Sequence, residues 1–412
     1  HRLGIDEPTK DVTEQILIGL SPRLEKFHDV MIDTEAITAA VELSARYIHD
    51  KKNPDKSIDL IDSACARERV KDAGTVKVTR DQIMAQVSRV TSVPMDRLQN
   101  ERSAKIVELD SNIKQKLYGQ DAAVDSVLER VYINFSGIGQ DKKPIASFLF
   151  LGPTGTGKTE TAKQLASNLG VKLVRFDMSE YQEKHSVAKL IGSPPGYVGY
   201  DEGGQLTEKI KNNPFSVVLF DEIEKAHKDV FNILLQILDE GHLTDSFGRK
   251  INFTNTIVIM TSNVGAKRVS DLGAGVGFKT SSSEEQQYEV RKTMIQKALK
   301  QQFNPEFLNR IDDIILFNSL NDETLRKIIG IEVNNLNKRL INKNYKINFD
   351  KTVINRIYEL NSQEEYGARP LKRIIQNLCE DFLSEEILKG TILENVQYTL
   401  KYKDENLLIS KK

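Results

Sequence analysis

The sequence of 412 residues contains no tryptophan and only two cysteines, Cys65 and Cys379, which lie far apart in the chain. So few cysteines argue against a disulfide framework or a cysteine-based metal cluster, and they suit a reducing compartment. No apolar stretch approaches the roughly 20 residues that cross a bilayer, and the first residues lack the apolar segment of a signal peptide. We therefore expect a protein of the cytoplasm, or of an organelle matrix or stroma, with no membrane partner.

The chain also lacks an excess of either charge. Its 58 Lys and Arg residues balance 59 Asp and Glu residues, which argues against nucleic acid as the main partner. With 39% hydrophobic and 28% charged residues, the composition is that of ordinary globular protein, and the length suits two or three domains. The chain does not begin with Met, so we expect it to be a fragment of a longer protein.

One motif stands out from this ordinary background. Residues 152–159 fit the pattern G-x-x-x-x-G-K-[ST], in which backbone N–H groups surround the phosphates of a nucleoside triphosphate. An apolar run at 146–151 precedes it and a helical pattern at 161–169 follows, as the motif requires. Lys158 is expected to reach the β- and γ-phosphates, and the Thr159 hydroxyl to ligate Mg²⁺. The predicted nucleotide-binding residues of this loop are Gly152, Pro153, Thr154, Gly155, Thr156, Gly157, Lys158 and Thr159.

Acidic residues follow a second apolar run, at 217–220. Asp221 and Glu222 would lie at the carboxyl edge of a sheet, where Asp221 can hold Mg²⁺ and Glu222 can act as general base toward water. Asn263 ends another apolar run and is a candidate to orient that water. Taken singly, each of Arg310 and Arg369 is more usually a surface arginine, but in an ATPase each is a candidate to stabilise charge on the transferred phosphoryl group.

The order of apolar runs divides the chain into parts. Residues 1–90 have helical periodicity and residues 91–117 form a polar linker. Residues 118–317 alternate short apolar runs with helical ones, which predicts an α/β domain with a parallel five-stranded sheet flanked by helices. Residues 318–412 are predicted to be a helical lobe that ends in a β hairpin around residues 404–406. The predicted sheet strands are 148–151, 173–176, 217–220, 256–260 and 314–317.

Several longer motifs occur in a fixed order along the chain. They are residues 175–181 (RFDMSEY), 192–199 (GSPPGYVG), 221–227 (DEIEKAH) and 367–370 (GARP). Together with the phosphate loop, Asn263 and Arg310, they resemble the second ATPase ring of Clp-type AAA+ protein unfoldases of the ClpA/ClpC class. The resemblance covers residues 118–412 and implies a large ATPase subdomain at 118–317 and a small subdomain at 318–412. Residues 53–62 are similar to the helical lobe of the first ring, so residues 1–90 are expected to be the small lobe of a truncated first module.

The resemblance implies roles for individual residues. Tyr118 and Gly119 would pack on adenine, Asn263 would sense the γ-phosphate, and Arg369 would sense nucleotide from the small subdomain. Arg310 would act on the nucleotide of a neighbouring subunit, so the implied assembly is a homo-hexamer. Gly196, Tyr197, Val198 and Gly199 would form a loop in the central pore, where the large amphipathic face of Tyr197 grips polypeptide without regard to sequence.

Two further features bear on the branch of the family. Only about ten residues, 69–79, bridge a region in which ClpB-type disaggregases and ClpC carry a long coiled-coil insertion, and this resembles ClpA. Val276, Gly277 and Phe278 are similar to the ClpC form of the loop that docks on a ClpP-like peptidase ring. These features favour different branches, and the sequence leaves the choice between ClpA-like and ClpC-like open.

The sequence thus predicts an ATPase that uses ATP and Mg²⁺ to unfold polypeptides and thread them through a hexameric pore into a ClpP-like peptidase. Adaptors and unfolded polypeptides are the other implied partners. The alternative within the family is a ClpB-type disaggregase that acts without a peptidase. A nucleic-acid motor and a non-enzymatic nucleotide-binding scaffold are the alternatives from other classes; the balanced charge argues against the first.

Overall fold

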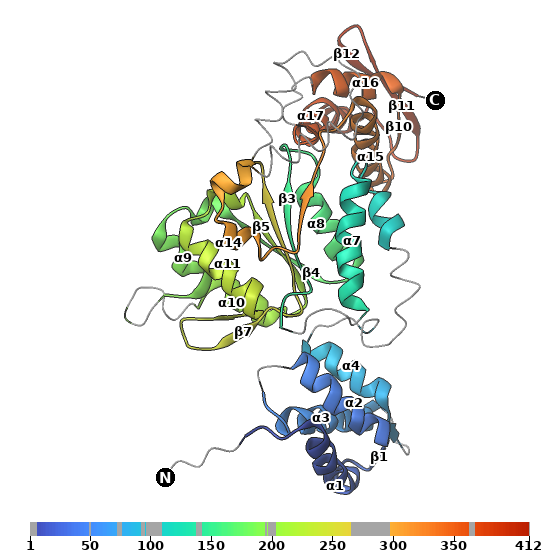
Figure 1. The fold of residues 1–412 in the computed structure, drawn as a ribbon. Coiled ribbons are helices and arrows are strands. Elements are labelled where there is room, and N and C mark those ends of the chain that lie inside the picture. The colour runs from blue at the N-terminus through green and yellow to red at the C-terminus, as the bar shows by residue number, and fades with distance from the viewer. Residues whose placement is uncertain are drawn as a thin grey trace.

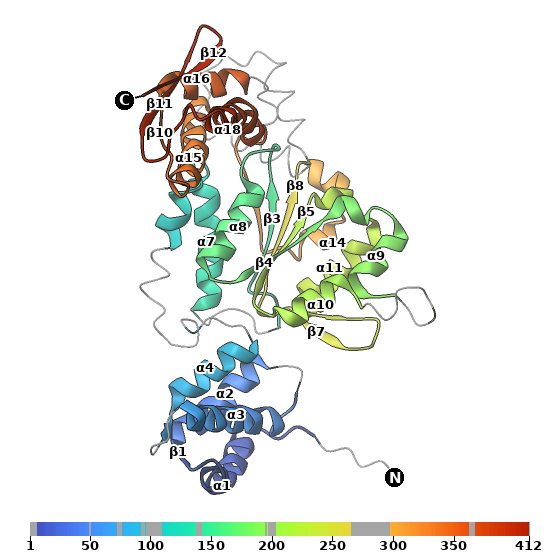
Figure 2. The ribbon, with the colours of Figure 1, turned by 180° about the vertical axis from the view of Figure 1, so that it is seen from behind.

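The computed structural model describes residues 6–48, 51–71, 76–91, 95, 109–136, 142–193, 196, 203–264, 297–361 and 367–411. They form a helical N-terminal lobe, a central α/β domain and a C-terminal lobe that follow one another along the molecule (Figures 1 and 2). Among these residues, none of the helices is long and apolar enough to cross a membrane.

The N-terminal lobe packs its helices around one apolar core that includes Leu17, Ile37, Leu60 and Ile83. The lobe is mostly helical, as expected, and it also contains a short two-stranded parallel sheet that the sequence analysis did not predict. Each of these strands has three residues, too few to give a periodic pattern. The elements are α1 (Lys10–His28), β1 (Val30–Ile32), α2 (Thr34–Tyr47), α3 (Asp55–Lys71), β2 (Val76–Val78) and α4 (Arg80–Thr91).

The central domain is built on a five-stranded parallel sheet with the order β4-β5-β8-β3-β9. All five predicted strands are present, each shifted by at most two residues at either end. Strands β3, β5 and β8 are buried along their whole length, as expected of a parallel sheet covered on both faces. The strands are β3 (Ala146–Leu151), β4 (Lys172–Asp177), β5 (Ser216–Asp221), β8 (Ile257–Ser262) and β9 (Asp313–Leu316).

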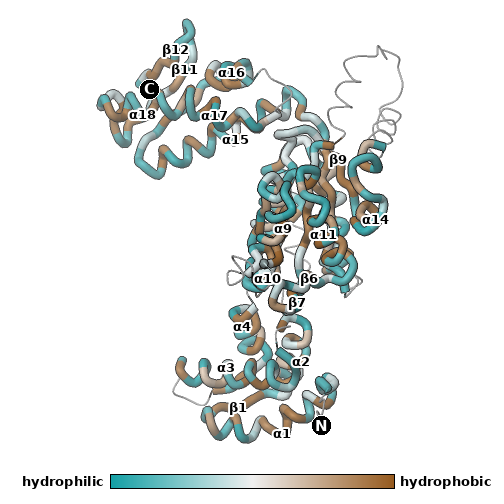
Figure 3. The backbone as a smooth tube through the Cα atoms, turned by 90° about the vertical axis from the view of Figure 1, so that its left-hand side faces the viewer, coloured by the Kyte–Doolittle hydropathy of each residue, from teal (hydrophilic) through white to brown (hydrophobic). Residues whose placement is uncertain are grey.

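Alternate residues of each strand enter different cores. Phe148 and Phe150 of β3 pack with the helices on one face, whereas Leu149 and Leu151 pack on the other. In Figure 3 the sheet region is largely hydrophobic and the outer helices carry hydrophilic residues. One face is covered by α7 (Asp121–Phe135) and α8 (Lys158–Asn168). The opposite face is covered by α9 (Lys184–Ile191), α10 (Gln205–Asn212), α11 (Lys228–Glu240) and α14 (Pro305–Leu308).

The C-terminal lobe contains the predicted β hairpin, and its strands β11 and β12 pair in antiparallel fashion. The prediction missed β10, which pairs in parallel with β11, and it missed the π-helical segment Gln376–Glu380 within the helical run 371–388. The elements are α15 (Asp322–Ile341), β10 (Lys346–Phe349), α16 (Lys351–Leu360), α17 (Leu371–Ile375), α18 (Asp381–Leu388), β11 (Gln397–Lys403) and β12 (Asn406–Lys411).

An aromatic contact joins the N-terminal lobe to the central domain. Tyr47, at the end of α2, and Phe215, directly before β5, have ring centroids 5.3 Å apart, and both side chains are buried. The guanidinium of Arg46 also lies over the Tyr47 ring, 5.4 Å from its centroid. Phe215 therefore belongs to the N-terminal core although it precedes a strand of the ATPase sheet.

We expect the substitution Phe215→Ala to lower the free energy of unfolding by about 3 kcal/mol, because it leaves a cavity between the N-terminal lobe and the central domain. Urea unfolding followed by circular dichroism measures this loss. The matched control is Phe27→Ala, since Phe27 is 80% exposed and should cost less than about 0.5 kcal/mol. Equal effects of the two substitutions would contradict the interface described above.

Candidate active site

The predicted site residues from three strands gather at one edge of the central sheet. The phosphate loop follows β3, Asp221 ends β5, and Asn263 comes directly after β8. Because β8 pairs with both β3 and β5 in parallel, the carboxyl ends of these strands meet. Ligands of open α/β sheets bind at this edge. The sequence-based expectation that these motifs converge is therefore met by the fold.

The phosphate loop has a backbone that only glycine adopts without strain. Gly152, Gly155 and Gly157 all have positive φ angles, of 151°, 78° and 106°. A Cβ atom on Gly152 would lie 2.5 Å from the carbonyl oxygen of Phe317, so this position also excludes a side chain sterically. Gly157 is the N-cap of α8, and the loop therefore leads into a helix N-terminus, which favours anions.

Lys158 folds back over this loop. Its ammonium group donates hydrogen bonds to the carbonyl oxygens of Gly152 (2.6 Å) and Pro153 (2.7 Å). Burial lowers the pKa of Lys158 to about 8, while the negative charges of Glu224, Asp221 and Glu222 act in the opposite direction. The cation is thus held near the loop, where an incoming phosphate would compensate its charge better than neutral carbonyl groups do.

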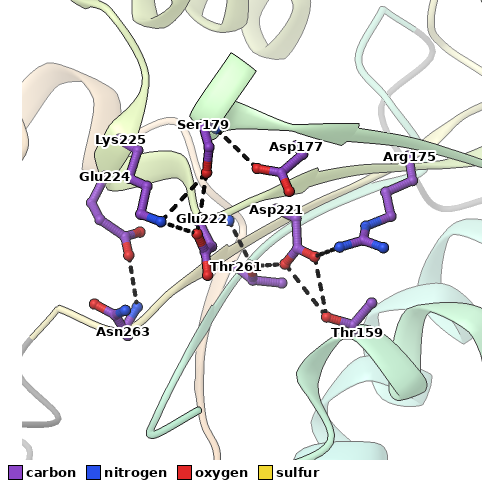
Figure 4. Close-up of polar contacts among 10 residues, drawn as sticks. All are labelled: Thr159, Arg175, Asp177, Ser179, Asp221, Glu222, Glu224, Lys225, Thr261 and Asn263. Atoms are coloured by element: carbon purple, nitrogen blue, oxygen red, sulfur yellow. Dashed lines mark hydrogen bonds and ion pairs between the residues drawn. The ribbon is translucent and has the colours of Figure 1, made fainter. Parts of the chain in front are cut away.

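Asp221 is the centre of a polar cluster (Figure 4). Its Oδ1 accepts a hydrogen bond from the Thr261 hydroxyl, and its Oδ2 accepts one from Nη2 of Arg175 at 2.7 Å. The Thr159 hydroxyl lies 3.4 Å from both carboxylate oxygens. A hydroxyl and a carboxylate this close fit Mg²⁺, which prefers oxygen ligands and usually binds one or two carboxylates together with substrate phosphates.

Glu222 has an unusual backbone, with φ of 58° for a residue that carries a Cβ atom. Its N–H donates to the Thr261 hydroxyl at 3.0 Å, which fixes the turn after β5. The Glu222 carboxylate forms an ion pair with Lys225 and accepts a 3.4 Å hydrogen bond from the Ser179 hydroxyl (Figure 4). The pKa of Lys225 is raised, chiefly by its hydrogen bond to Glu222.

Asn263 lies beside these acids and is exposed (Figure 4). Its backbone N–H is 3.4 Å from Oε1 of Glu224. The amide side chain is thus at the same edge as Glu222, as the sequence predicts.

The C-terminal lobe contacts the phosphate loop directly. The Ala368 N–H donates to the carbonyl oxygen of Gly155 at 3.1 Å. Gly367, with φ of 53°, approaches so closely that a Cβ atom there would lie 2.8 Å from the same oxygen. Arg369 directly follows Ala368 in the chain and is exposed, so its backbone begins next to the residue that contacts the loop.

The segment with Tyr118 and Gly119 lies where the central domain meets the C-terminal lobe. The Gln120 amide donates to the carbonyl oxygens of Thr156 (3.1 Å) and Asn318 (2.8 Å), and its Oε1 accepts from the Asn318 N–H. A Cβ atom on Gly119 would lie 3.0 Å from the Thr324 side chain, at the start of α15. The sequence analysis missed Gln120, which connects the phosphate loop to the chain that enters the C-terminal lobe.

Arg310 is not brought to the phosphate loop of its own chain. Its Nη1 forms an ion pair with Asp239 near the end of α11, at 2.6 Å. The side chain is 41% exposed and therefore faces the surface.

Two predicted loops fall largely outside the described residues. Gly196 is described; it is exposed with φ of 90°, and a Cβ atom there would meet open space. Tyr197, Val198 and Gly199 lie outside the described part of the chain. The predicted docking residues Val276, Gly277 and Phe278 lie outside it too.

Arg175, Ser179, Lys225 and Thr261 were not predicted as site residues. Thr261 could have been suspected, because it is a polar residue near the end of a strand that the sequence places next to the site. Arg175, Ser179 and Lys225 lie within the motifs at residues 175–181 and 221–227, but spacing alone gives no indication that they contact the acids. Among the described residues, no group of three or more His, Cys, Asp or Glu side chains could hold a metal ion.

The sheet order, the phosphate loop and the attached helical lobe define a AAA+ ATPase. The family model of the AAA domain (Cdc48 subfamily) matches residues 143–314, that of the AAA lid domain matches 9–116, and that of the C-terminal D2-small domain of ClpB protein matches 320–400. The chain belongs to the Clp family of AAA+ ATPases.

The chain is similar to known protein sequences and to solved structures. The chain is 42% identical to the ATP-dependent Clp protease ATP-binding subunit ClpC of Staphylococcus aureus (strain USA300) over 97% of its length, and 41% identical to that of Staphylococcus epidermidis. It spans only 56% of these relatives. A closed-state structure of Hsp104 with ATPγS and FITC casein matches with a TM-score of 0.83 at 35% identity, covering 99% of this chain and 70% of that one. The extended S. cerevisiae Hsp104:casein complex matches with a TM-score of 0.82, also at 35% identity, and covers 100% and 70%.

The lowered pKa of Lys158 predicts how stability depends on pH. Below about pH 8 the Lys158 ammonium is charged and buried in the folded chain, which lowers the free energy of unfolding. This destabilisation decreases as the pH rises from 8 toward 10.5, the ordinary pKa of lysine, because the folded chain loses the proton while the unfolded chain still holds it. Relative to a Lys158→Met variant, which has no such group, the wild-type free energy of unfolding should rise by about 2 kcal/mol between pH 7 and pH 9.5. Urea unfolding without nucleotide measures the difference.

The control for this experiment is Lys163→Met, on the same helix but with a side chain that is 62% exposed. The curve of this variant should remain parallel to that of the wild type. Parallel pH dependence of the Lys158→Met variant and the wild type would show that the Lys158 ammonium is not buried when nucleotide is left out of the assay.

Proposed function

We propose that this chain belongs to an ATP-driven protein unfoldase and translocase that works as a homo-hexamer and delivers polypeptide to a ClpP-like peptidase. The observation that supports this most directly is the convergence at one sheet edge of the phosphate loop, Thr159, Asp221 and Glu222, with Ala368 of the C-terminal lobe bonded to the same loop. A site so connected can link nucleotide binding to movement of a lobe.

The proposed binding of ATP uses groups already in position. The backbone N–H groups of the phosphate loop and the Lys158 ammonium would bind the phosphates, and Lys158 would exchange its two carbonyl partners for phosphate oxygens. Thr159 and Asp221 would hold Mg²⁺, which when bound neutralises phosphate charge. Tyr118 and Gly119, at the junction of the lobes, would border the adenine.

The proposed hydrolysis requires a change at Glu222. The carboxylate must leave Lys225 before it can accept a proton from water, and Ser179 contacts both partners and can guide this exchange. Asn263, exposed at the same edge, would orient the water. Arg310 would leave Asp239 and approach the nucleotide of an adjoining subunit, where an arginine supplied in trans stabilises the transition-state charge.

The proposed mechanical step begins at the C-terminal lobe. Gly367 and Ala368 touch the phosphate loop and Arg369 follows them in the chain, so a bound triphosphate would change the position of the C-terminal lobe relative to the sheet. Gly196 has the conformational freedom expected at the base of a moving loop, and Tyr197 would grip the polypeptide in the pore.

The similarity to ClpC proteins supports the ClpC type. The matching curated relatives are named as ATP-binding subunits of a Clp protease, which supports coupling to a peptidase through Val276, Gly277 and Phe278. The length of the alignment supports the ClpA type instead. The alignment spans 462 residues and the chain has only 412, as expected if the chain lacks an insertion that the ClpC relatives carry. The rival proposal is a disaggregase without a peptidase, because the similar Hsp104 structures contain casein as a bound protein.

Substitution of the proposed base tests whether the site is catalytic. We expect Glu222→Gln to lower the rate of phosphate release from ATP at least about 100-fold while nucleotide binding is retained, because the amide cannot accept the proton. The control is Glu180→Gln, an exposed acid close to the site, which should keep wild-type turnover. Unchanged turnover in Glu222→Gln would support the nucleotide-binding scaffold instead.

Substitutions in the proposed pore loop and in the proposed docking loop should affect one protein substrate differently. With a ClpP-like peptidase present, Phe278→Ala should abolish ATP-dependent degradation of a tagged folded protein but leave its unfolding intact, as judged by loss of the substrate's fluorescence. Tyr197→Ala should abolish both, because the grip on the polypeptide is lost. Degradation that survives Phe278→Ala contradicts docking, and unfolding without any peptidase-dependent degradation favours the disaggregase.

A further inference from the structure

Arg175 occupies an unexpected position next to the proposed metal ligands. It projects from β4, the edge strand of the sheet, and its Nη2 donates to Oδ2 of Asp221 at 2.7 Å (Figure 4). The Arg175 side chain is 53% exposed, whereas the Asp221 side chain is 11% exposed. The guanidinium therefore reaches from solvent to an almost buried carboxylate, and the proposed function gives it no role.

The hydrogen bonds of Asp221 show what this contact does to the site. Thr261 donates to one carboxylate oxygen and Arg175 to the other, and the Thr159 hydroxyl lies 3.4 Å from both. The charge of Asp221 is thus compensated by a cation of the chain itself. A divalent ion that approached the same oxygens would be repelled by the guanidinium.

The guanidinium has a second carboxylate within reach. Asp177 ends the same strand as Arg175, and it is paired in register with Asp221 on the neighbouring strand. Burial would raise the pKa of Asp177, but hydrogen bonds from Ser179 and the positive charges of Arg175 and Lys225 lower it overall. Because the Arg175 side chain is long and half exposed, it can leave Asp221 while it remains near Asp177 and solvent.

We propose that Arg175 is a resident counter-ion of Asp221 that must withdraw when Mg²⁺ and nucleotide enter, and that it thereby sets the magnesium concentration at which the site fills. This inference rests on the proposed function of Asp221. Arg175 is in this view a positioning residue: it compensates the charge of Asp221, and it prevents Asp221 from holding a divalent ion when no nucleotide is bound. The competing assignment is an arginine that binds the phosphates directly.

The two assignments differ in the sign of one effect. Replacing Arg175 by Gln removes the competing cation, so the free Mg²⁺ concentration that half-saturates binding of a fluorescent ADP analogue should fall about three- to tenfold. Affinity for the same analogue in EDTA should stay within about twofold of wild type, because a counter-ion of Asp221 makes no phosphate contact. A phosphate-binding arginine would instead weaken binding in both conditions.

Thermal unfolding provides a readout that does not depend on turnover. In EDTA, Arg175→Gln leaves Asp221 without its cation, and the unfolding temperature should fall below that of wild type. With Mg²⁺ and ADP the difference should shrink, because the guanidinium has already left Asp221 in the wild type. A merely structural ion pair would give the same loss in both conditions.

The matched control is Lys172→Gln, which removes one positive charge from the same exposed edge strand without touching Asp221. Its magnesium dependence should equal that of wild type. A higher or unchanged magnesium requirement in Arg175→Gln, or an equal shift in Lys172→Gln, overturns the inference but leaves the proposed ATPase intact. If the wild-type chain bound no nucleotide in any condition, the proposed function itself would fail, and this inference with it.

Discussion

The central constraint on this molecule is the burial of a parallel sheet on both faces. Strands β3, β5 and β8 expose no side chain, so polar groups are accommodated only where the strands end. Because the strands are parallel, their carboxyl ends meet at the same edge, and the phosphate loop, Asp221 and Asn263 are brought together from positions far apart in the chain. The site is thus a consequence of sheet packing before any catalytic role is considered.

In the part of the chain that the structure describes, polar contacts connect the C-terminal lobe to this edge. Ala368 bonds to the carbonyl oxygen of Gly155, and Gln120 bonds to Thr156 on one side and to Asn318 on the other. The central domain and the C-terminal lobe have separate apolar cores, so little apolar surface needs to be exposed when one moves relative to the other. A lobe that contacts the phosphate loop directly is well placed to respond to the ligand of that loop.

The charged groups of the site are compensated within the chain. Lys158 is bonded to carbonyl oxygens of its own loop, Asp221 to Arg175, and Glu222 to Lys225. In the function proposed above, each of these pairings is exchanged when phosphate, metal or water is engaged, so that no charge is left without a partner. The arrangement suggests that ligand binding proceeds by replacement of internal partners and not by filling an open, preformed site.

Much of the fold and the core of the site could be predicted from the sequence, because apolar runs, the glycine pattern of residues 152–157 and the acids after 220 are local features. The five sheet strands and the C-terminal hairpin were found in this way. The sequence could not reveal the contacts of Arg175 with Asp221, of Lys225 with Glu222 or of Ala368 with Gly155, nor the short strands β1, β2 and β10. These depend on which segments the packing brings together, and pairing across a fold leaves no periodic trace in the chain. Local chemistry thus determined which residues are able to act, and only tertiary packing decided which of them meet.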